Sequence, residues 1–166
     1  ADDFGRKVRN QIASPDFNSV FPQVGLRADS SSAKRFHTMQ GGTYSAVGAG
    51  GAITGRGAHL LIIDDPIKGR EDAESETQRR NLVEWYKSVA YTRLQPGGKI
   101  IIIQTRWHQD DLAGHILAES KEDWKVLDLP AIDNKGNALW PEAYSKEDLE
   151  KIKDTVGQRV WQALYQ

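Results

Sequence analysis

The 166-residue chain contains no cysteine, no long apolar run and almost no net charge. The lack of cysteine excludes disulfides and thiolate metal sites, and it is compatible with a reducing compartment. No apolar run approaches the roughly 18 residues that span a bilayer, and no signal-peptide pattern opens the chain. The sequence therefore predicts a cytoplasmic protein without a membrane partner.

A net charge of −1 gives the chain no overall attraction to DNA or to acidic membranes. Any nucleic-acid contact is then expected to be local or shared between subunits. Hydrophobic residues make up 39% of the chain and charged residues 27%, which is typical of a soluble globular protein. The length predicts one domain or a large piece of one. Because the chain starts at Ala1 inside a predicted helix, we expect a piece that begins partway through its fold.

Apolar spacing and turn residues predict the secondary structure. Ser75 and Gln78 have the spacing of a capping box ahead of a helix, and Asp110 and Asp111 are expected to open another. A Pro-Gly-Gly sequence at residues 96–98 is expected to turn the chain into an apolar run. Further helices are expected over residues 2–12, 145–152 and 156–165, and strands over residues 33–39, 43–47, 60–63, 100–103 and 124–129.

Two aliphatic runs end in polar residues that can carry chemistry. Residues 60–66 read LLIIDDP, and residues 100–107 read IIIIQTRW. Short unbroken apolar runs are typical of parallel strands covered on both faces. A strand, helix and strand joined in this way lie parallel, with their carboxyl ends on one edge of the sheet. We therefore expect Asp64, Asp65, Gln104 and Thr105 to share one cleft.

The residue types at these strand ends suit magnesium-dependent phosphate chemistry. Asp64 suits a Mg²⁺ ligand, and the adjacent Asp65 suits a group that orients or deprotonates an attacking water. Gln104 and Thr105 suit groups that hydrogen-bond the terminal phosphate or that water. Arg56, in a glycine-rich segment, could supply positive charge to the transition state, within its own chain or across a subunit boundary.

One component of such a site is missing from these 166 residues. Phosphate binding of this type needs a G-x-x-x-x-G-K-[ST] loop, whose backbone amides and lysine surround the phosphates. No segment here supplies it, and Gly98-Lys99 is rejected because Ile100 follows it. Either the loop precedes Ala1, or the chain does not hydrolyse ATP.

The sequence GRGAH leading into LLIIDDP, followed by IIIIQTRWHQDDLAG, resembles the large terminase subunit of tailed bacteriophages. The resemblance covers residues 56–117 well and the flanks more loosely. It implies a Walker B segment, with Asp64 as magnesium ligand and Asp65 as catalytic carboxylate, and a coupling motif at Gln104 and Thr105. It also implies an α/β fold of the P-loop NTPase type, in its additional-strand class. That fold has three layers, a mainly parallel sheet flanked by helices on both sides, and it would be incomplete here without the phosphate loop.

The resemblance further implies a DNA-packaging motor in the bacterial host cytoplasm. ATP and Mg²⁺ would be its cofactors in the intact protein. Its partners would be double-stranded viral DNA, the portal of the procapsid and the small terminase subunit, with the large subunits forming a homo-oligomeric ring. Residues 1–166 would be the later part of the ATPase domain, without the nuclease domain. Asp65 departs from the glutamate common in such motors, so backbone placement or an extra water must offset its shorter side chain.

Other interpretations of the same residues stay open. The chain could be a non-catalytic ATPase-like interaction module without a phosphate loop. It could also be a Mg²⁺-dependent nuclease that uses Asp64, Asp65, Asp110 and Asp111, although the last two are more typical of helix starts. An Asp-Asp-Pro sequence is also typical of a turn after a strand, and the two histidines at positions 108 and 115 are a weak metal signal.

Overall fold

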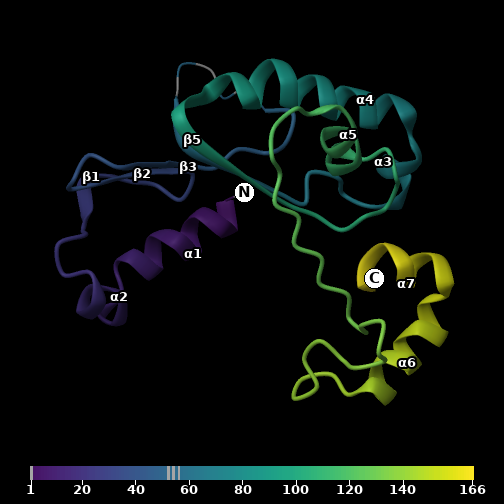
Figure 1. The fold of residues 1–166 in the computed structure, drawn as a ribbon. Coiled ribbons are helices and arrows are strands. Elements are labelled where there is room, and N and C mark those ends of the chain that lie inside the picture. The colour runs from purple at the N-terminus through teal and green to yellow at the C-terminus, as the bar shows by residue number, and fades with distance from the viewer. Residues whose placement is uncertain (1, 52, 54, 56) are drawn as a thin grey trace. The chain divides into compact units, whose positions relative to one another are not determined.

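The computed structural model describes residues 2–51, 53, 55 and 57–166. The chain divides into two compact units, Ala1–Thr54 and Gly55–Gln166, and the boundary lies in the glycine-rich segment. Figure 1 shows the elements of each unit along the chain. No helix in the described part of the chain has both the length and the apolar character needed to cross a membrane.

The N-terminal unit contains two helices and a small antiparallel sheet. Its elements are α1 (Asp2–Ile12), α2 (Pro15–Val20), β1 (Leu26–Ser31), β2 (Arg35–Thr38) and β3 (Thr43–Ser45), with strand order β1-β2-β3. The predicted helix over residues 2–12 is confirmed, and the strands predicted over residues 33–39 and 43–47 are present with shorter bounds. The sequence prediction missed β1, whose residues LRADSS are mostly polar and lack the apolar alternation of a half-buried strand.

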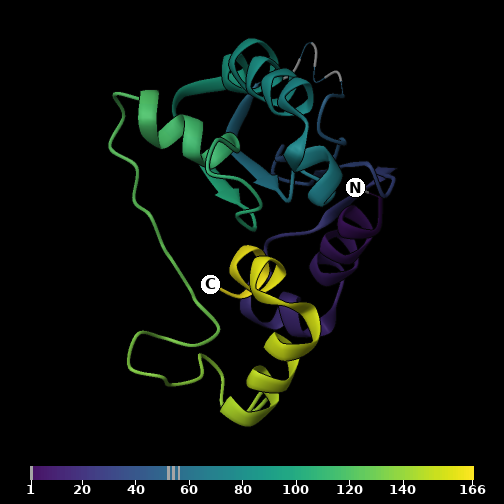
Figure 2. The ribbon, with the colours of Figure 1, turned by 90° about the vertical axis from the view of Figure 1, so that its right-hand side faces the viewer.

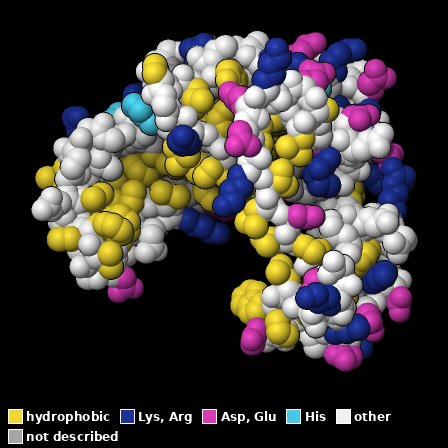
Figure 3. All heavy atoms as spheres, in the orientation of Figure 1, with side chains coloured by type: hydrophobic (Ala, Val, Ile, Leu, Met, Phe, Trp, Pro, Cys, Tyr) yellow, Lys and Arg dark blue, Asp and Glu magenta, His cyan; other side chains and the backbone are white. Residues whose placement is uncertain are grey.

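One aromatic pair forms the centre of this unit. Phe36 on β2 is buried and stacks on Tyr44 of β3, with 4.8 Å between the ring centroids. Gly5 allows α1 to approach closely, because a Cβ atom there would lie 1.9 Å from the carbonyl oxygen of Ala33. Other hydrophobic side chains of the unit remain exposed, and Figure 3 shows such side chains gathered at its surface.

The C-terminal unit is built around two parallel strands. β4 (Ala58–Asp64) pairs with β5 (Leu94–Ile103), so that Ile63 lies opposite Ile102 and Asp64 lies opposite Ile103. The connection between the strands contains α3 (Arg70–Glu74), α4 (Glu76–Trp85), η1 (Tyr86–Ala90) and η2 (Tyr91–Arg93), and the later elements are α5 (Leu112–Glu119), α6 (Lys146–Val156) and α7 (Gln158–Tyr165). The predicted parallel strands and the crossover helix are confirmed.

Local sequence signals place several of these helices. The hydroxyl oxygen of Ser75 accepts a hydrogen bond from the backbone N–H of Gln78, as the predicted cap of α4 requires. Ser145 caps α6 in the same way, through the backbone N–H of Asp148. Gly157, with a φ of 80°, separates α6 from α7. This backbone conformation suits glycine, so the chain ends one helix and starts another without strain.

One face of the parallel sheet forms the core of the C-terminal unit. The buried residues Ile63, Tyr86, Ala90, Leu112 and Ile116 make one cluster, against which Leu61, Ile100 and Ile102 pack. Helix α4 with η1 and helix α5 therefore cover the same face of the strands (Figure 2). The residues that alternate with these along the two strands lie on the opposite face and are 45–54% exposed, namely Leu60, Ile62, Ile101 and Ile103. The described residues thus form an α/β unit with one covered sheet face, where two covered faces were expected.

Two other expectations are wrong. Residues 124–129 do not form a strand, because they run without regular structure and pair with no neighbouring strand among the described residues. Residues 96–98 do not precede the second strand but lie inside β5. There the pairing shifts between Ala58 opposite Leu94 and Leu60 opposite Lys99, and Gly97 has a φ of 78°. The Pro-Gly-Gly sequence therefore makes an irregularity within a strand, which turn propensity alone does not distinguish from a turn before one.

The alternation of buried and exposed residues on β4 predicts unequal effects of two adjacent substitutions. Ile63→Ala should lower the free energy of unfolding by about 2–5 kcal/mol, because it empties part of the core. Ile62→Ala should cost under about 1 kcal/mol, because that side chain is half exposed. Urea unfolding of both variants beside the parent measures the difference. Equal losses would contradict the register of β4.

Candidate active site

The ends of β4 and β5 lie side by side. The backbone N–H of Asp65 donates to the carbonyl oxygen of Ile103 (2.9 Å), which extends the strand pairing by one residue. The backbone N–H of Thr105 donates to Oδ1 of Asp65, with 3.3 Å between the atoms. The structure therefore brings Asp64, Asp65, Gln104 and Thr105 to one edge of the sheet, as the sequence predicts. Their chemical roles stay predictions.

Asp65 has an unusual backbone conformation. Its φ of 39° is positive, and among the described residues other than glycine it is alone in this. Aspartate and asparagine adopt the left-handed region more readily than other L-residues. Asp64 and Asp65 are both exposed, so a ligand can approach their side chains. The conformation fits a turn after the strand, and the Asp65 carboxylate accepts the hydrogen bond from the neighbouring strand end.

Gln104 carries a polar group that its surroundings leave unsatisfied. Both the Oε1 and the Nε2 atoms of its amide are buried, and neither forms a hydrogen bond with another described residue. A buried amide without partners costs free energy, commonly about 1–3 kcal/mol. Groups of this kind are rare in folded proteins. This observation goes beyond what the sequence predicts for Gln104.

An ion pair between the exposed Arg106 and the buried Asp111 follows the β5 end directly. The Asp111 side chain is 0% exposed, and its Oδ2 accepts a hydrogen bond from Nε of Arg106 (2.8 Å). Its Oδ1 accepts one from the backbone N–H of Gly114 (2.9 Å), which confirms the predicted role of Asp111 at the start of α5. The sequence prediction missed Arg106, because a contact across an irregular loop has no periodic signal.

Helix α7 contacts the same edge of the sheet. The carbonyl oxygen of Ala163 accepts a hydrogen bond from the backbone N–H of Arg106 (3.1 Å). Near the other end of α7, Nη2 of Arg159 lies 2.5 Å from Oε1 of Glu74 on α3. The hydrogen bond from Arg70 (2.7 Å) and the charge of Arg159 hold the pKa of Glu74 below its ordinary value. The elements that follow the two strand ends are thus tied to one another.

The other described candidate residues do not gather into a metal site. Arg56 lies outside the described residues. Within the described part of the chain, no group of three or more His, Cys, Asp or Glu side chains could hold a metal ion. Asp111 is committed to Arg106 and to the helix cap, so it is not available to join Asp64, Asp65 and Asp110 in the four-carboxylate arrangement of the nuclease interpretation. The two histidines have local contacts, with the Asp110 backbone N–H and with Glu119.

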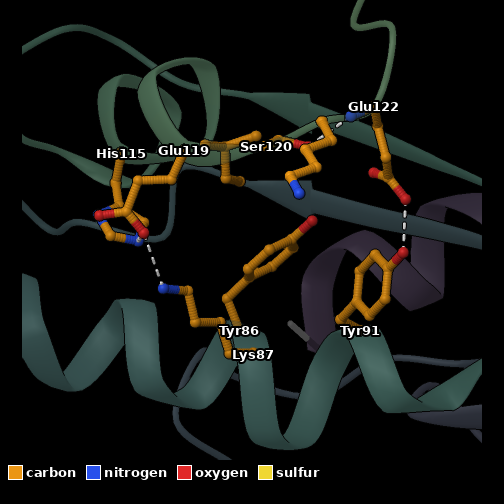
Figure 4. Close-up of a pocket in the computed structure, with 9 residues that line it drawn as sticks. Tyr86, Lys87, Tyr91, His115, Glu119, Ser120 and Glu122 are labelled. Atoms are coloured by element: carbon orange, nitrogen blue, oxygen red, sulfur yellow. Dashed lines mark hydrogen bonds and ion pairs between the residues drawn. The ribbon is translucent and has the colours of Figure 1, made fainter.

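A separate pocket of about 360 Å³ lies between the end of the α4–η1 helix and the end of α5. Figure 4 shows Tyr86 and Tyr91 on one side of it and His115 and Glu119 on the other. Burial, with the nearby charge of Glu122, raises the pKa of Tyr86 to about 12. Asp64, Asp65, Gln104 and Thr105, the candidate site residues that the structure describes, do not line this pocket.

Comparison with known protein families assigns the chain. A family model described as terminase large subunit, T4likevirus-type, N-terminal, matches residues 10–164. The match includes both strand ends and nearly the whole chain, so the chain belongs to the phage large terminase subunits. The family acts in phage DNA packaging, with DNA and packaging components as its partners. A search among curated proteins found none that matches.

The raised pKa of Tyr86 predicts how stability depends on alkaline pH. The folded state holds the phenol proton more tightly than the unfolded chain, in which tyrosine has its ordinary pKa of 10.0. The stability that this adds is full below pH 10 and is lost as the pH rises through about 12. Tyr86→Phe should therefore make the loss of stability across this range less steep, as measured by urea unfolding. An equal slope in both proteins would contradict the raised pKa.

Proposed function

We propose that this chain forms the later part of the ATPase domain of a large terminase subunit, which drives viral DNA into the procapsid by ATP hydrolysis. The fold would be of the P-loop NTPase type, in its additional-strand class, and the complete domain would have three layers, with a mainly parallel sheet between helices. The main support is the contact between the two strand ends, where the backbone N–H of Thr105 reaches the carboxylate of Asp65. Family membership supports the role in packaging.

The residues at the strand ends fit a site for magnesium and ATP. Mg²⁺ is usually held by one or two carboxylates together with substrate phosphates and water, so the exposed Asp64 is a sufficient protein ligand. The unsatisfied amide of Gln104 offers both a donor and an acceptor to a phosphate or a water. When bound with ATP, the ion would neutralise negative charge on the phosphates.

Each candidate site residue then has a defined role in hydrolysis. Asp65 orients the attacking water and accepts its proton. The amide of Gln104 and the hydroxyl group of Thr105 hydrogen-bond the terminal phosphate or the water, and they change partners once the phosphate bond is broken. Arg56 supplies positive charge to the transition state.

The short side chain of Asp65 is compatible with this task. Aspartate reaches less far than the glutamate common in related motors, so its carboxylate must be positioned by the backbone or supplemented by a water. The left-handed backbone of Asp65 and its hydrogen bond with Thr105 support positioning by the backbone. The proposed partners of the complete motor are double-stranded DNA, the portal, the small terminase subunit and further copies of the large subunit in a ring.

A non-catalytic interaction module is the second candidate. It is favoured by one feature of residues 1–166, which contain no G-x-x-x-x-G-K-[ST] loop. In that case the same α/β unit would contribute a surface to a packaging assembly without hydrolysing ATP. The nuclease interpretation has less support, because Asp111 is engaged by Arg106.

The decisive substitution is Asp65→Asn in the complete gene product that contains this chain. Asparagine tolerates a positive φ and can still accept a hydrogen bond from Thr105, so the fold should remain intact. Loss of the carboxylate should lower Mg²⁺-dependent ATP turnover by about a hundredfold or more, since proton transfer contributes this much to many enzymes. Phosphate release measured with saturating ATP and DNA checks the prediction.

Asp128→Asn serves as the matched control, because Asp128 is an exposed carboxylate in the segment after α5. It should leave turnover unchanged. Turnover by Asp65→Asn equal to that of the parent would remove Asp65 from the catalytic site. A parent protein without ATPase activity, even with DNA and procapsids, would favour the interaction module.

The 166-residue chain on its own should hydrolyse ATP no faster than background. The lysine and the amide groups of the phosphate loop provide much of the affinity for the β- and γ-phosphates, and these residues contain no such loop. The same phosphate-release assay, at matched concentrations of the chain and of the complete protein, makes the comparison. Comparable turnover by both would show that another segment binds the phosphates.

A further inference from the structure

We propose that the ion pair between Arg106 and Asp111 is a positioning device, which holds the end of β5 at the distance from Asp65 that catalysis requires. This inference rests on the proposed ATPase function and assigns a role to two residues outside the catalytic set. Arg106 follows Thr105 directly in the chain, and Asp111 is the residue before α5. We name these two side chains the clamp.

Asp111 is the fixed half of the clamp. Among the described residues, Asp111 is a charged residue that is fully buried, with 0% of its surface exposed. Both carboxylate oxygens are used, one by Nε of Arg106 and one by the backbone N–H of Gly114. A buried carboxylate is costly unless it is paired and hydrogen-bonded, so removal of either contact disturbs the other.

Arg106 is the half that touches the strand end. Besides its bond to Asp111, its Nη2 donates to the carbonyl oxygen of Gln109 (3.2 Å). Its backbone N–H donates to Ala163 of α7 (3.1 Å). A single residue thus joins the end of β5 to the loop, to α5 and to α7. The planar guanidinium group can serve two acceptors in fixed directions, which an ammonium group cannot do equally well.

The loop between the two residues has little room to adjust. At Gly114, in the first turn of α5, a Cβ atom would lie only 1.8 Å from the carbonyl oxygen of Gln109 and 3.0 Å from Nη2 of Arg106. The loop backbone and the helix are therefore in direct contact. We therefore expect a change in the clamp to move the end of β5 and not the helix, because Leu112 and Ile116 hold the helix in the core.

The contact that the clamp would control is weak by itself. The hydrogen bond from Thr105 to Asp65 measures 3.3 Å, just beyond the usual range of about 2.7–3.2 Å. The backbone bond from Asp65 to Ile103 aligns the strands. It leaves Gln104 and Thr105, the two residues that follow, without a strong contact of their own to Asp65. Ion pairs with a buried partner often contribute little net stability, and in some proteins they select one geometry among several; in the clamp the aspartate is buried and the arginine side chain is 43% exposed. Here the selected geometry would be that of Gln104 and Thr105 relative to Asp65.

The test compares variants of the complete gene product in steady-state ATP hydrolysis. Asp111→Asn keeps an oxygen that can cap α5, since asparagine and aspartate are about equal at this position, but it removes the charge that holds Arg106. The turnover number kcat should fall by about tenfold or more, because small displacements of catalytic groups have such effects. KM for ATP should change by less than about twofold, because the clamp does not contact substrate.

Two further variants separate positioning from general stability. Arg106→Lys keeps a positive charge beside Asp111 but loses the second bond to Gln109, so its kcat should lie between those of Asp111→Asn and the parent. Ile116→Val removes a buried methyl group from the same helix, away from the clamp. It should leave kcat unchanged even if its thermal midpoint falls as far as that of Asp111→Asn.

Amide hydrogen exchange provides a readout that does not depend on activity. In Asp111→Asn the exchange at residues 104–106 should become faster, while the exchange of the Leu112–Glu119 helix stays as in the parent. Unchanged exchange at residues 104–106, or a kcat loss equalled by Ile116→Val, would overturn the positioning role. A parent without ATPase activity, or a fully active Asp65→Asn, would instead overturn the proposed function on which the role depends.

Discussion

The register of the parallel pairing between β4 and β5 determines the geometry at the candidate site. With Asp64 opposite Ile103, the next backbone N–H, that of Asp65, bonds to Ile103, and Thr105 then meets the Asp65 carboxylate. The same register turns Ile63 and Ile102 toward the helices. A shift of one residue would exchange the buried and exposed faces of a strand. The hydrophobic core and the strand pairing as far as Ile103 therefore depend on one constraint, and the proposed clamp acts on the residues that follow.

The sequence predicts those parts of the arrangement that have a local signal, such as an aliphatic run or a helix cap. Both strands, their parallel direction and the shared edge follow from two aliphatic runs that flank a helix. The caps at Ser75 and Asp111 depend on contacts three residues apart, which a sequence pattern contains. The strands and caps are correct because each is fixed by residues that are close in the chain, and the parallel direction follows from the helix that connects the two strands. The approach of Asp65 to Thr105, 40 residues apart, follows from the strand pairing and not from a signal of its own.

The missed features depend on neighbours that no local pattern identifies. Residues 124–129 have the composition of a strand, but a strand also needs a partner, and among the described residues none pairs with them. Strand β1 shows the converse, since its polar residues pair with β2 despite their composition. The bond between Arg106 and Asp111 spans an irregular loop, where residue spacing does not determine contact. Tertiary structure decides all three.

Asp65 alone does not distinguish a catalytic site from a simple turn. A positive φ, an exposed carboxylate and a following proline suit the end of any strand, and the hydrogen bond from Thr105 could serve only to close the turn. Gln104 adds a second observation at the same strand ends. A structural turn does not require a neighbouring amide to be buried without partners, at a cost of about 1–3 kcal/mol. A phosphate or a water at the strand ends would provide those hydrogen bonds, in keeping with the proposed site. The proposed catalytic role therefore accommodates both Gln104 and Asp65, whereas a turn alone addresses only Asp65.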